Sequence, residues 1–256
     1  AGYGANHVIA GNEVLPYEIH FENMRTATAP AQDVFISDRL NPAQFDLSTF
    51  SLGEVRFGDR VITPPAGLKS FASVVPHDLD GDPATTDDQM LVVLNAALDT
   101  NPSSANYGRI NWSYRTLDPA TLESPADPDL GFLPPNIAAP VGEGSVKFTV
   151  QLQPGLAPNT QMGSAAVIVF DVNAPIYTNP WFNKITANPI LTLRQNGAAA
   201  EVEWVGAPAA YTLQQTSQLG ANAWTDVVAA PVSIGGGVER VILPIDGDQM
   251  YFRLRP

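Results

Sequence analysis

The segment Val146-Lys147-Phe148-Thr149-Val150-Gln151-Leu152 alternates apolar and polar side chains at every position. A period of two is the pattern of an extended strand that buries one face and exposes the other. Lys147 falls among the outward positions, so we expect its ammonium group in water. The alternation predicts antiparallel β-structure, and it recurs at Tyr17–Glu22, Val34–Asp38, Phe50–Phe57, Arg109–Tyr114 and Ala165–Phe170.

Proline and glycine separate these segments. The chain holds 23 prolines and 20 glycines, which leave little room for long helices. One helix-length segment remains, Asp88–Leu98, but its centre Leu91–Leu94 equally fits a buried strand. Turn signals at this spacing favour a sandwich of antiparallel sheets.

A second series of strands begins after Lys184–Pro189, where an Asn- and Pro-rich segment ends. We therefore predict an all-β chain of two tandem antiparallel β-sandwiches, with domains at 1–185 and 186–256. The second domain is close to the lower size limit for a self-sufficient core. Its expected strands are Ile190–Leu193, Ala200–Trp204, Tyr211–Gln215, Trp224–Val228, Val238–Leu243 and Met250–Leu254.

The composition argues against several classes of partner. Asp and Glu number 26 against 13 Lys and Arg, and the formal net charge of −13 repels nucleic-acid phosphates and anionic lipid. No apolar run approaches the roughly 20 residues of a membrane helix, so we expect no membrane insertion. The absence of cysteine removes disulfides, thiolate catalysis and zinc–thiolate sites. The abrupt start at Ala1 suggests a piece of a longer exported precursor.

The segment Gly11–Leu40 resembles the opening of the immunoglobulin-like repeats of bacterial surface proteins known as DUF11-type repeats. The resemblance is carried by Tyr17, Ile19, Phe21 and Asn23, followed by Ser37, Asp38 and Leu40. The segment Ala165–Asn179 resembles the last strands of these repeats. Leu117–Thr121 and Gly131–Asn136 look like a longer relative near the C-termini of very large secreted bacterial proteins. The resemblance implies an immunoglobulin-like sandwich that serves as a spacer or adhesive stalk.

The C-terminal part resembles a small β-module that terminates large secreted proteins of some Gram-negative bacteria. The similar stretches are Val202–Trp204, Leu213–Ser217, Trp224–Val227 and Tyr251–Arg255. This resemblance implies fibronectin-like packing and an extracellular or cell-surface location.

An acidic segment offers the strongest metal-binding pattern. Carboxylates at close spacing, with Gly81 for a tight turn, can surround one hard cation, and calcium fits best because it accepts flexible oxygen coordination. The segment is not an EF-hand loop, since Pro83 and Gln89 replace the usual glycine and glutamate. A solvated acidic hairpin tip is the alternative. The candidate calcium ligands are Asp78, Asp80, Asp82, Asp87 and Asp88.

A looser set of aspartates lies at strand ends. Inter-repeat calcium is one interpretation, but such residues more often cap turns by accepting hydrogen bonds from backbone N–H groups. We favour turn capping for this set, which consists of Asp38, Asp118, Asp127, Asp129 and Asp171.

Aromatic residues suggest a weak ligand site. Tyr177 and Trp181, with Phe182, lie in what reads as a Pro- and Asn-rich loop, and exposed rings there can stack on sugars. The other tryptophans, Trp112, Trp204 and Trp224, are expected in sandwich cores, where large rings dominate packing.

The sequence contains no motif that specifies catalysis. His7, His20 and His77 are its only histidines, and none lies in a His-Glu-x-x-His pattern. We therefore expect a non-enzymatic structural or adhesive module, stabilised by calcium, whose partners are neighbouring domains or copies of itself. In one form it is a filament or surface-layer subunit whose leader Ala1–Ala10 docks on the next copy. The alternative is a carbohydrate-binding module of a secreted hydrolase, with polysaccharide as partner.

Overall fold

The computed structural model describes residues 7–9, 11, 14–79, 84, 88–186, 189–205, 211–220, 223–234, 238–245, 247 and 249–255. Every regular element in these ranges is a strand, from β1 (Val8–Ile9) to β20 (Tyr251–Arg255), so the all-β prediction is confirmed. None of the described segments is a helix with the length and apolar character needed to cross a membrane.

The chain divides into two compact units. The first consists mainly of Val14–Gln151 and Met162–Phe182, and the second of Leu152–Gln161, Asn183–Pro256 and the described residues of Gly2–Glu13. The main division therefore falls after Phe182, near the expected boundary at residue 185. The second unit also takes in two short segments from earlier in the chain.

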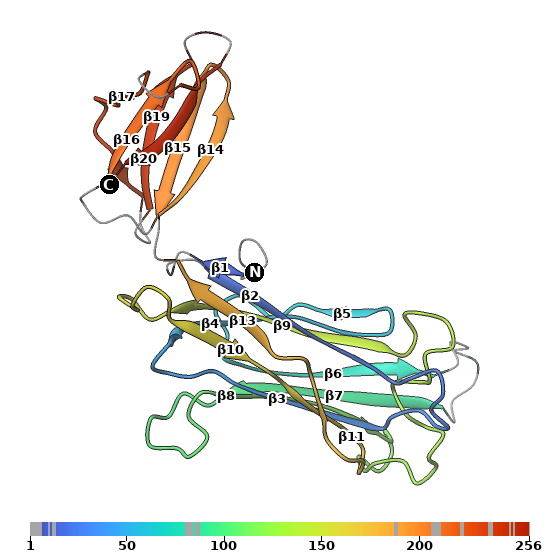
Figure 1. Ribbon diagram of the computed structural model, residues 1–256. Helices are drawn as coiled ribbons and strands as arrows, with labels where there is room; N and C mark the ends of the chain where they lie inside the picture. Colours follow the sequence, from blue (N-terminus) through green and yellow to red (C-terminus); the bar gives the residue numbers. More distant parts are fainter. Residues whose placement is uncertain are drawn as a thin grey trace. The chain divides into compact units, whose positions relative to one another are not determined.

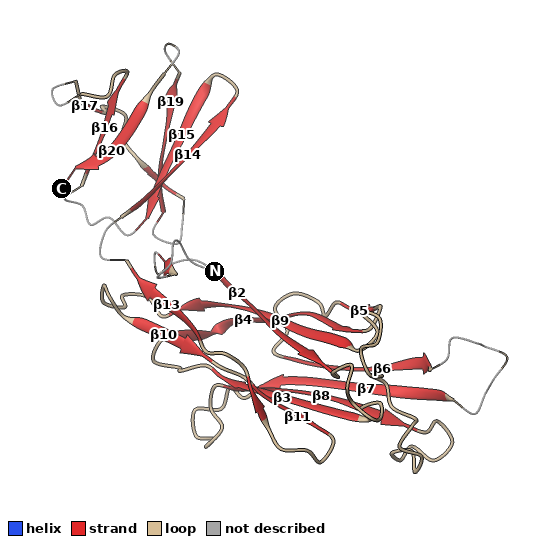
Figure 2. Ribbon diagram, turned by 45° about the vertical axis from the view of Figure 1, so that its right-hand side comes forward, coloured by secondary structure: helices blue, strands red, loops and turns tan. Residues whose placement is uncertain are grey.

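Two antiparallel sheets form the first unit, and Figures 1 and 2 show them as separate layers. The smaller sheet has the order β2-β9-β4-β5, with β2 at its edge. The larger has the order β12-β11-β3-β8-β7-β6. The smaller sheet contains β2 (Val14–Glu22), β9 (Glu143–Leu152), β4 (Phe45–Phe57) and β5 (Arg60–Ile62). The larger contains β12 (Ile176–Tyr177), β11 (Val167–Phe170), β3 (Asp33–Arg39), β8 (Arg109–Leu117), β7 (Gln89–Leu98) and β6 (Ser70–Asp78). The ambiguous segment Asp88–Leu98 is thus a strand.

The core of the first unit follows the alternation in β9. Val146, Phe148 and Val150 are fully buried, and the Phe148 ring stacks on Tyr17 at a centroid distance of 5.0 Å. Trp112 also meets Phe148, at 5.9 Å, and is 1% exposed, as expected of a core tryptophan. These rings bury large apolar surfaces between the sheets and hold them together.

One glycine of β9 is required by packing. A Cβ atom on Gly144 would overlap the ring of Phe21, which lies opposite it on β2. Larger side chains at this position would force the two strands apart, because a packed core cannot absorb added volume.

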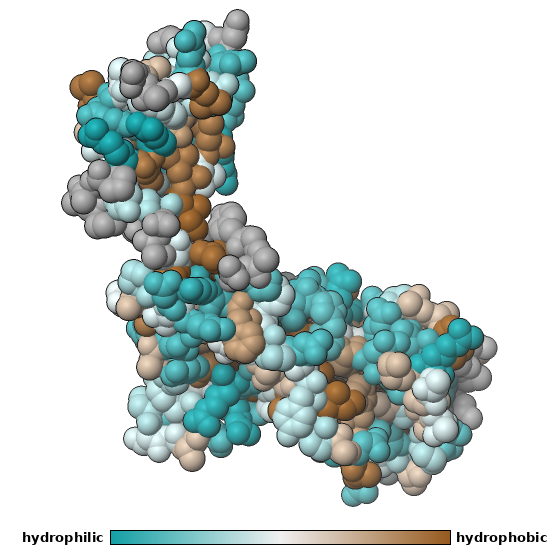
Figure 3. Space-filling view, in the orientation of Figure 1, coloured by the Kyte–Doolittle hydropathy of each residue, from teal (hydrophilic) through white to brown (hydrophobic). Residues whose placement is uncertain are grey.

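The second unit also contains two antiparallel sheets, of orders β14-β15-β19-β18 and β17-β16-β20. Its core cluster contains Val202, Trp204, Leu213, Val241 and Leu243. Figure 3 shows a strip of apolar surface on this unit, consistent with a small core that leaves apolar side chains partly in water. The strands are β14 (Ile190–Asn196), β15 (Ala199–Val205), β16 (Thr212–Thr216), β17 (Thr225–Asp226), β18 (Val232–Ser233), β19 (Val238–Pro244) and β20.

Trp224 departs from the expected core position. It is half-buried and does not belong to the described core cluster. The guanidinium of Arg253 lies 4.3 Å from the centroid of its ring, and such a cation–π contact can stabilise a partly exposed ring.

A further sheet has the order β1-β13-β10. In it β1 pairs in parallel with β13 (Trp181–Ile185), and β10 spans Gln161–Ser164. The expectation that Tyr177, Trp181 and Phe182 lie in a loop is therefore wrong. Tyr177 belongs to β12, and after the turn that ends at Pro180 the buried Asn183 and Ile185 continue a strand. The described leader residues Val8 and Ile9 pair within their own chain.

Candidate functional site

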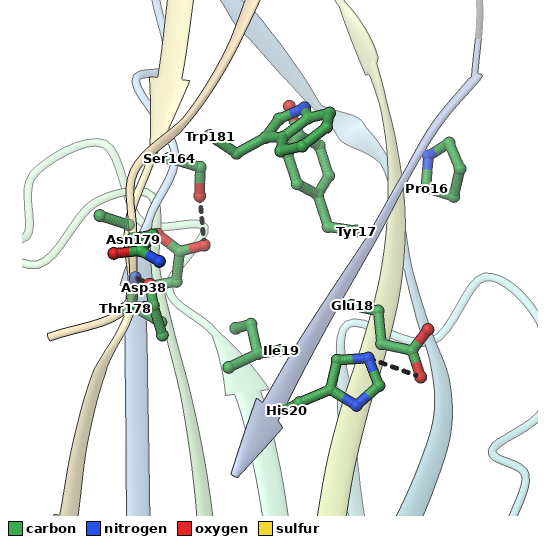
Figure 4. Close-up of a pocket in the computed structure, with 12 residues that line it drawn as sticks. Pro16, Tyr17, Glu18, Ile19, His20, Asp38, Ser164, Thr178, Asn179 and Trp181 are labelled. Carbon is green, nitrogen blue, oxygen red and sulfur yellow. Dashed lines mark hydrogen bonds and ion pairs between the residues drawn. The ribbon is translucent and has the colours of Figure 1, made fainter. Parts of the chain in front are cut away.

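A groove of about 430 Å³ runs beside the edge strand β2 in the first unit. One wall is the consecutive segment Pro16–His20. The opposite wall comes from the end of β3, the segment around Ser164, and residues just before and at the start of β13. Figure 4 shows Tyr17 and Trp181 projecting into the groove from these two walls. Its lining on that second wall consists of Asp38, Ser164, Ala165, Ala166, Thr178, Asn179 and Trp181.

The position of β2 explains why the groove exists. Within the described residues its ladder pairing is with β9 alone, so its other edge faces the groove. Pro16 interrupts the N–H groups of this strand, and proline is tolerated in a sheet mainly at an edge. The groove therefore borders an open sheet edge.

The side chains of β2 divide between the groove and the solvent face. Tyr17 packs against Phe148, and burial, together with the nearby charge of Asp38, raises its pKa to about 12. Glu18 faces the other way, 3.6 Å from both the His20 Nε2 and the Lys147 Nζ atoms. Lys147 also contacts Glu54 at 3.0 Å on this exposed face, as its outward position in the alternation predicted.

Asp38 places a carboxyl group in the wall of the groove. Its side chain is buried, and it accepts hydrogen bonds from the Ser164 hydroxyl at 2.6 Å and from the Arg39 backbone N–H at 2.6 Å. Burial raises the pKa of Asp38, and the two hydrogen bonds oppose that rise. Among the described residues no basic side chain forms an ion pair with it.

The two predicted ligand residues do not share this groove. Trp181 lines it and is 42% exposed, whereas Tyr177 is 71% exposed but lies on β12, opposite Val167 of β11. The structure instead brings Trp181 to the same groove as Tyr17, Asp38 and Ser164. Tyr17 and Asp38 stand in the stretches that carry the family resemblance, but no pattern in the sequence marks Ser164.

The predicted calcium ligands are only partly described. Asp78 ends β6 and pairs with Gln89, so Asp78 and Asp88 lie at the ends of a β6–β7 hairpin. Asp80, Asp82 and Asp87 lie outside the described residues. The residues that the structure describes contain no group of three acidic or histidine side chains arranged to hold a metal ion. Calcium binding here stays a prediction.

Four of the aspartates at strand ends accept backbone hydrogen bonds as expected, including Asp38, whose Oδ1 accepts from the Arg39 N–H. Asp118 Oδ1 accepts from the Ala120 N–H at 2.6 Å, and Asp127 Oδ1 accepts from the Asp129 N–H at 2.9 Å. Asp171 reaches further, since its Oδ1 accepts from the Gln32 and Asp33 N–H groups at the start of β3. These bonds define turns and strand ends.

Comparison with known protein families finds a match for one stretch of the chain. Residues 131–184 match a domain of unknown function, DUF7619. This stretch contains β9 to β12 and supplies Ser164, Asn179 and Trp181 to the groove. Among curated proteins, none matches the chain. The chain is thus an all-β protein whose first unit has a groove beside an open sheet edge.

Proposed function

We propose that the chain is a non-catalytic structural and adhesive module of a large exported bacterial protein, displayed at the cell surface or secreted. The first unit would be an immunoglobulin-like repeat of the DUF11 type and the second a fibronectin-like terminal module. The resemblances in Gly11–Leu40 and in the C-terminal strands support this assignment, as does the all-β architecture.

One observation carries the proposal: the open edge of β2 borders a groove with aromatic side chains on both walls. An extended segment laid beside β2 would add a strand to the β2-β9-β4-β5 sheet through main-chain hydrogen bonds. Tyr17 and Trp181 would contact its side chains, because both project into the groove (Figure 4). An exposed edge that is not covered in this way is a hazard for unspecific aggregation.

The strand would come from a neighbouring domain or from another copy of the chain. The net charge of −13 opposes association of copies at low ionic strength, so a specific groove would have to overcome this repulsion. Repulsion between surface charges is largely screened near physiological salt.

Sedimentation velocity over a range of concentrations at physiological salt tests the form in which another copy supplies the strand. We expect the unmodified chain to associate and Trp181→Ala to associate at least tenfold more weakly. Tyr177→Ala is the matched control, because it removes an exposed ring outside the groove. A chain that stays monomeric at every concentration, or equal association of both variants, would contradict this role for the groove.

Carbohydrate binding is a second candidate function. The observation in its favour is that two aromatic rings, Tyr177 and Trp181, stand 71% and 42% exposed. Pull-down on insoluble polysaccharides would test it, and no retention on any of them would remove this candidate.

A further inference from the structure

We infer that the outer face of the β12-β11-β3-β8-β7-β6 sheet is a binding platform for an uncharged polysaccharide. This inference rests on the carbohydrate-binding candidate and not on the groove beside β2. It adds a site, a ligand class and residues that the sequence did not indicate, apart from Tyr177.

The strand registers place two rows of side chains on this face. Their neighbours in the strands, among them Ile36, Trp112 and Ala96, are buried in the core, so the rows point outward. The first row crosses the sheet from Tyr177 through Val167, Ser37, Asn111 and Ala97 to Ser70. The second runs from Val169 through Phe35, Ser113 and Asn95 to Ala72.

Neither row contains a charged side chain, although the chain as a whole carries a net charge of −13. Charges begin at the borders of the two rows. Arg115 and Asp33 form an ion pair at 3.5 Å on one side, and Arg39 stands opposite Arg109 on the other. A neutral band between charged borders favours a ligand that is itself uncharged, because burying a charge against it would be costly.

The band is hollowed and carries aromatic rings. A depression of about 470 Å³ lies over its centre, where small residues such as Ala97 and Ser37 leave room. Phe35 is 40% exposed beside it, and Tyr177 is 71% exposed one strand beyond Val167. From strand spacing and rise the Cα atoms of the two aromatic residues lie roughly 12 Å apart. A single extended sugar chain could therefore contact both.

Polar side chains on the band have unused hydrogen-bonding capacity. Asn95 and Asn111 are exposed, Ser37 and Ser113 are half-buried, and none of these four side chains hydrogen bonds within the described part of the chain. An amide offers both donors and an acceptor, and a sugar hydroxyl is likewise donor and acceptor. Aromatic rings for stacking and free amides for hydroxyl groups together fit a neutral polysaccharide.

A second copy of the chain fits the band less well. Two such faces packed together would bury the amides of Asn95 and Asn111 against largely apolar neighbours, and an unsatisfied buried amide costs free energy. A polysaccharide satisfies the same groups through its own hydroxyls.

The experiment is retention on insoluble neutral polysaccharides, namely cellulose, chitin and a β-1,3-glucan, with soluble polygalacturonate as an anionic probe in affinity electrophoresis. We expect at least one neutral probe to retain the chain and the anionic probe not to. Phe35→Ala and Tyr177→Ala should each weaken retention at least tenfold. Asn111→Asp should weaken it as well, because it places a charge in the neutral band. Trp181→Ala tests the β2 groove as the alternative site. Ile137→Ala, at an exposed position outside both sites, is the control, and melting temperatures confirm that each variant folds.

Each remaining outcome overturns the inference in a distinguishable way. Retention that only Trp181→Ala abolishes would keep carbohydrate binding but place it at the groove. Retention that is unchanged in every variant would place the polysaccharide site elsewhere on the chain. No retention on any probe would remove carbohydrate binding and the platform together. Weakened self-association in Phe35→Ala without any retention would assign the face to a second copy.

Discussion

The hydroxyl of Ser164 donates a 2.6 Å hydrogen bond to Asp38 Oδ2, linking residues 126 positions apart. The bond joins the end of β3 to the end of β10 and fixes the carboxyl group in the wall of the β2 groove. It also explains how a buried carboxyl group with no ion-pair partner in the described part of the chain is tolerated, since hydrogen bonds replace part of its lost hydration.

The substitution Asp38→Asn should raise the free energy of unfolding, relative to that of the unmodified chain, by more at high pH than at low pH. Burial raises the pKa of Asp38 in the folded state, so its contribution to stability is full below the ordinary value of 3.8 and is lost as pH rises through the folded-state pKa. Asparagine keeps the shape without the charge. Urea unfolding of both proteins at pH 4 and pH 7 measures this, and an equal difference at both pH values would contradict it.

His77→Phe should reduce the loss of stability in mild acid. Burial, together with the nearby positive charge of Arg60, lowers the pKa of His77, and its ring packs edge-on against Phe57 at 5.6 Å. Its stabilising contribution is therefore present above the ordinary pKa of 6.5 and is lost as pH falls below it. The melting temperatures at pH 5 and pH 7.5 should differ less in the His77→Phe variant than in the unmodified chain. His20→Phe, at an exposed position, is the control.

Two neighbouring substitutions in β9 should have very different effects. Phe148→Ala removes a buried ring that contacts Tyr17, Phe50 and Trp112, and we expect a loss of about 3–5 kcal/mol in the free energy of unfolding. Lys147→Ala breaks only surface ion pairs, which contribute about 0–1 kcal/mol. Chemical denaturation measures both, and similar losses would show that the two faces of β9 are wrongly assigned.

Calcium should stabilise the chain if the acidic segment binds it. Tight binding to the folded state would raise the free energy of unfolding by roughly 3–4 kcal/mol at saturating metal. Melting with calcium, with magnesium and with a chelator measures this. Asp78→Asn with Asp88→Asn should abolish the increase, whereas Asp118→Asn, at a turn, should leave it. An identical melt with calcium and with chelator would contradict the prediction that the acidic segment binds calcium.

The sequence by itself determined the all-β fold class and, for the alternating segments that it identified as strands, the side that is buried. In Val146–Leu152 the alternation placed Phe148 in the core and Lys147 in water, and both positions are confirmed. This information is local, because a strand's side-chain period depends only on its own extended backbone. The same reasoning missed β6 and placed Trp181 in a loop, since short or edge strands bury too few residues to leave a clear pattern.

The tertiary structure alone decided which strands are neighbours, and with them both candidate sites. Alternation gives each strand an inner face but not a partner, and pairing depends on backbone hydrogen bonds between distant segments. Only the register of β12, β11 and β3 brings Tyr177 and Phe35 to one face. Only the fold brings Asp38, Ser164 and Trp181 beside β2, because residues from separate strand ends meet there.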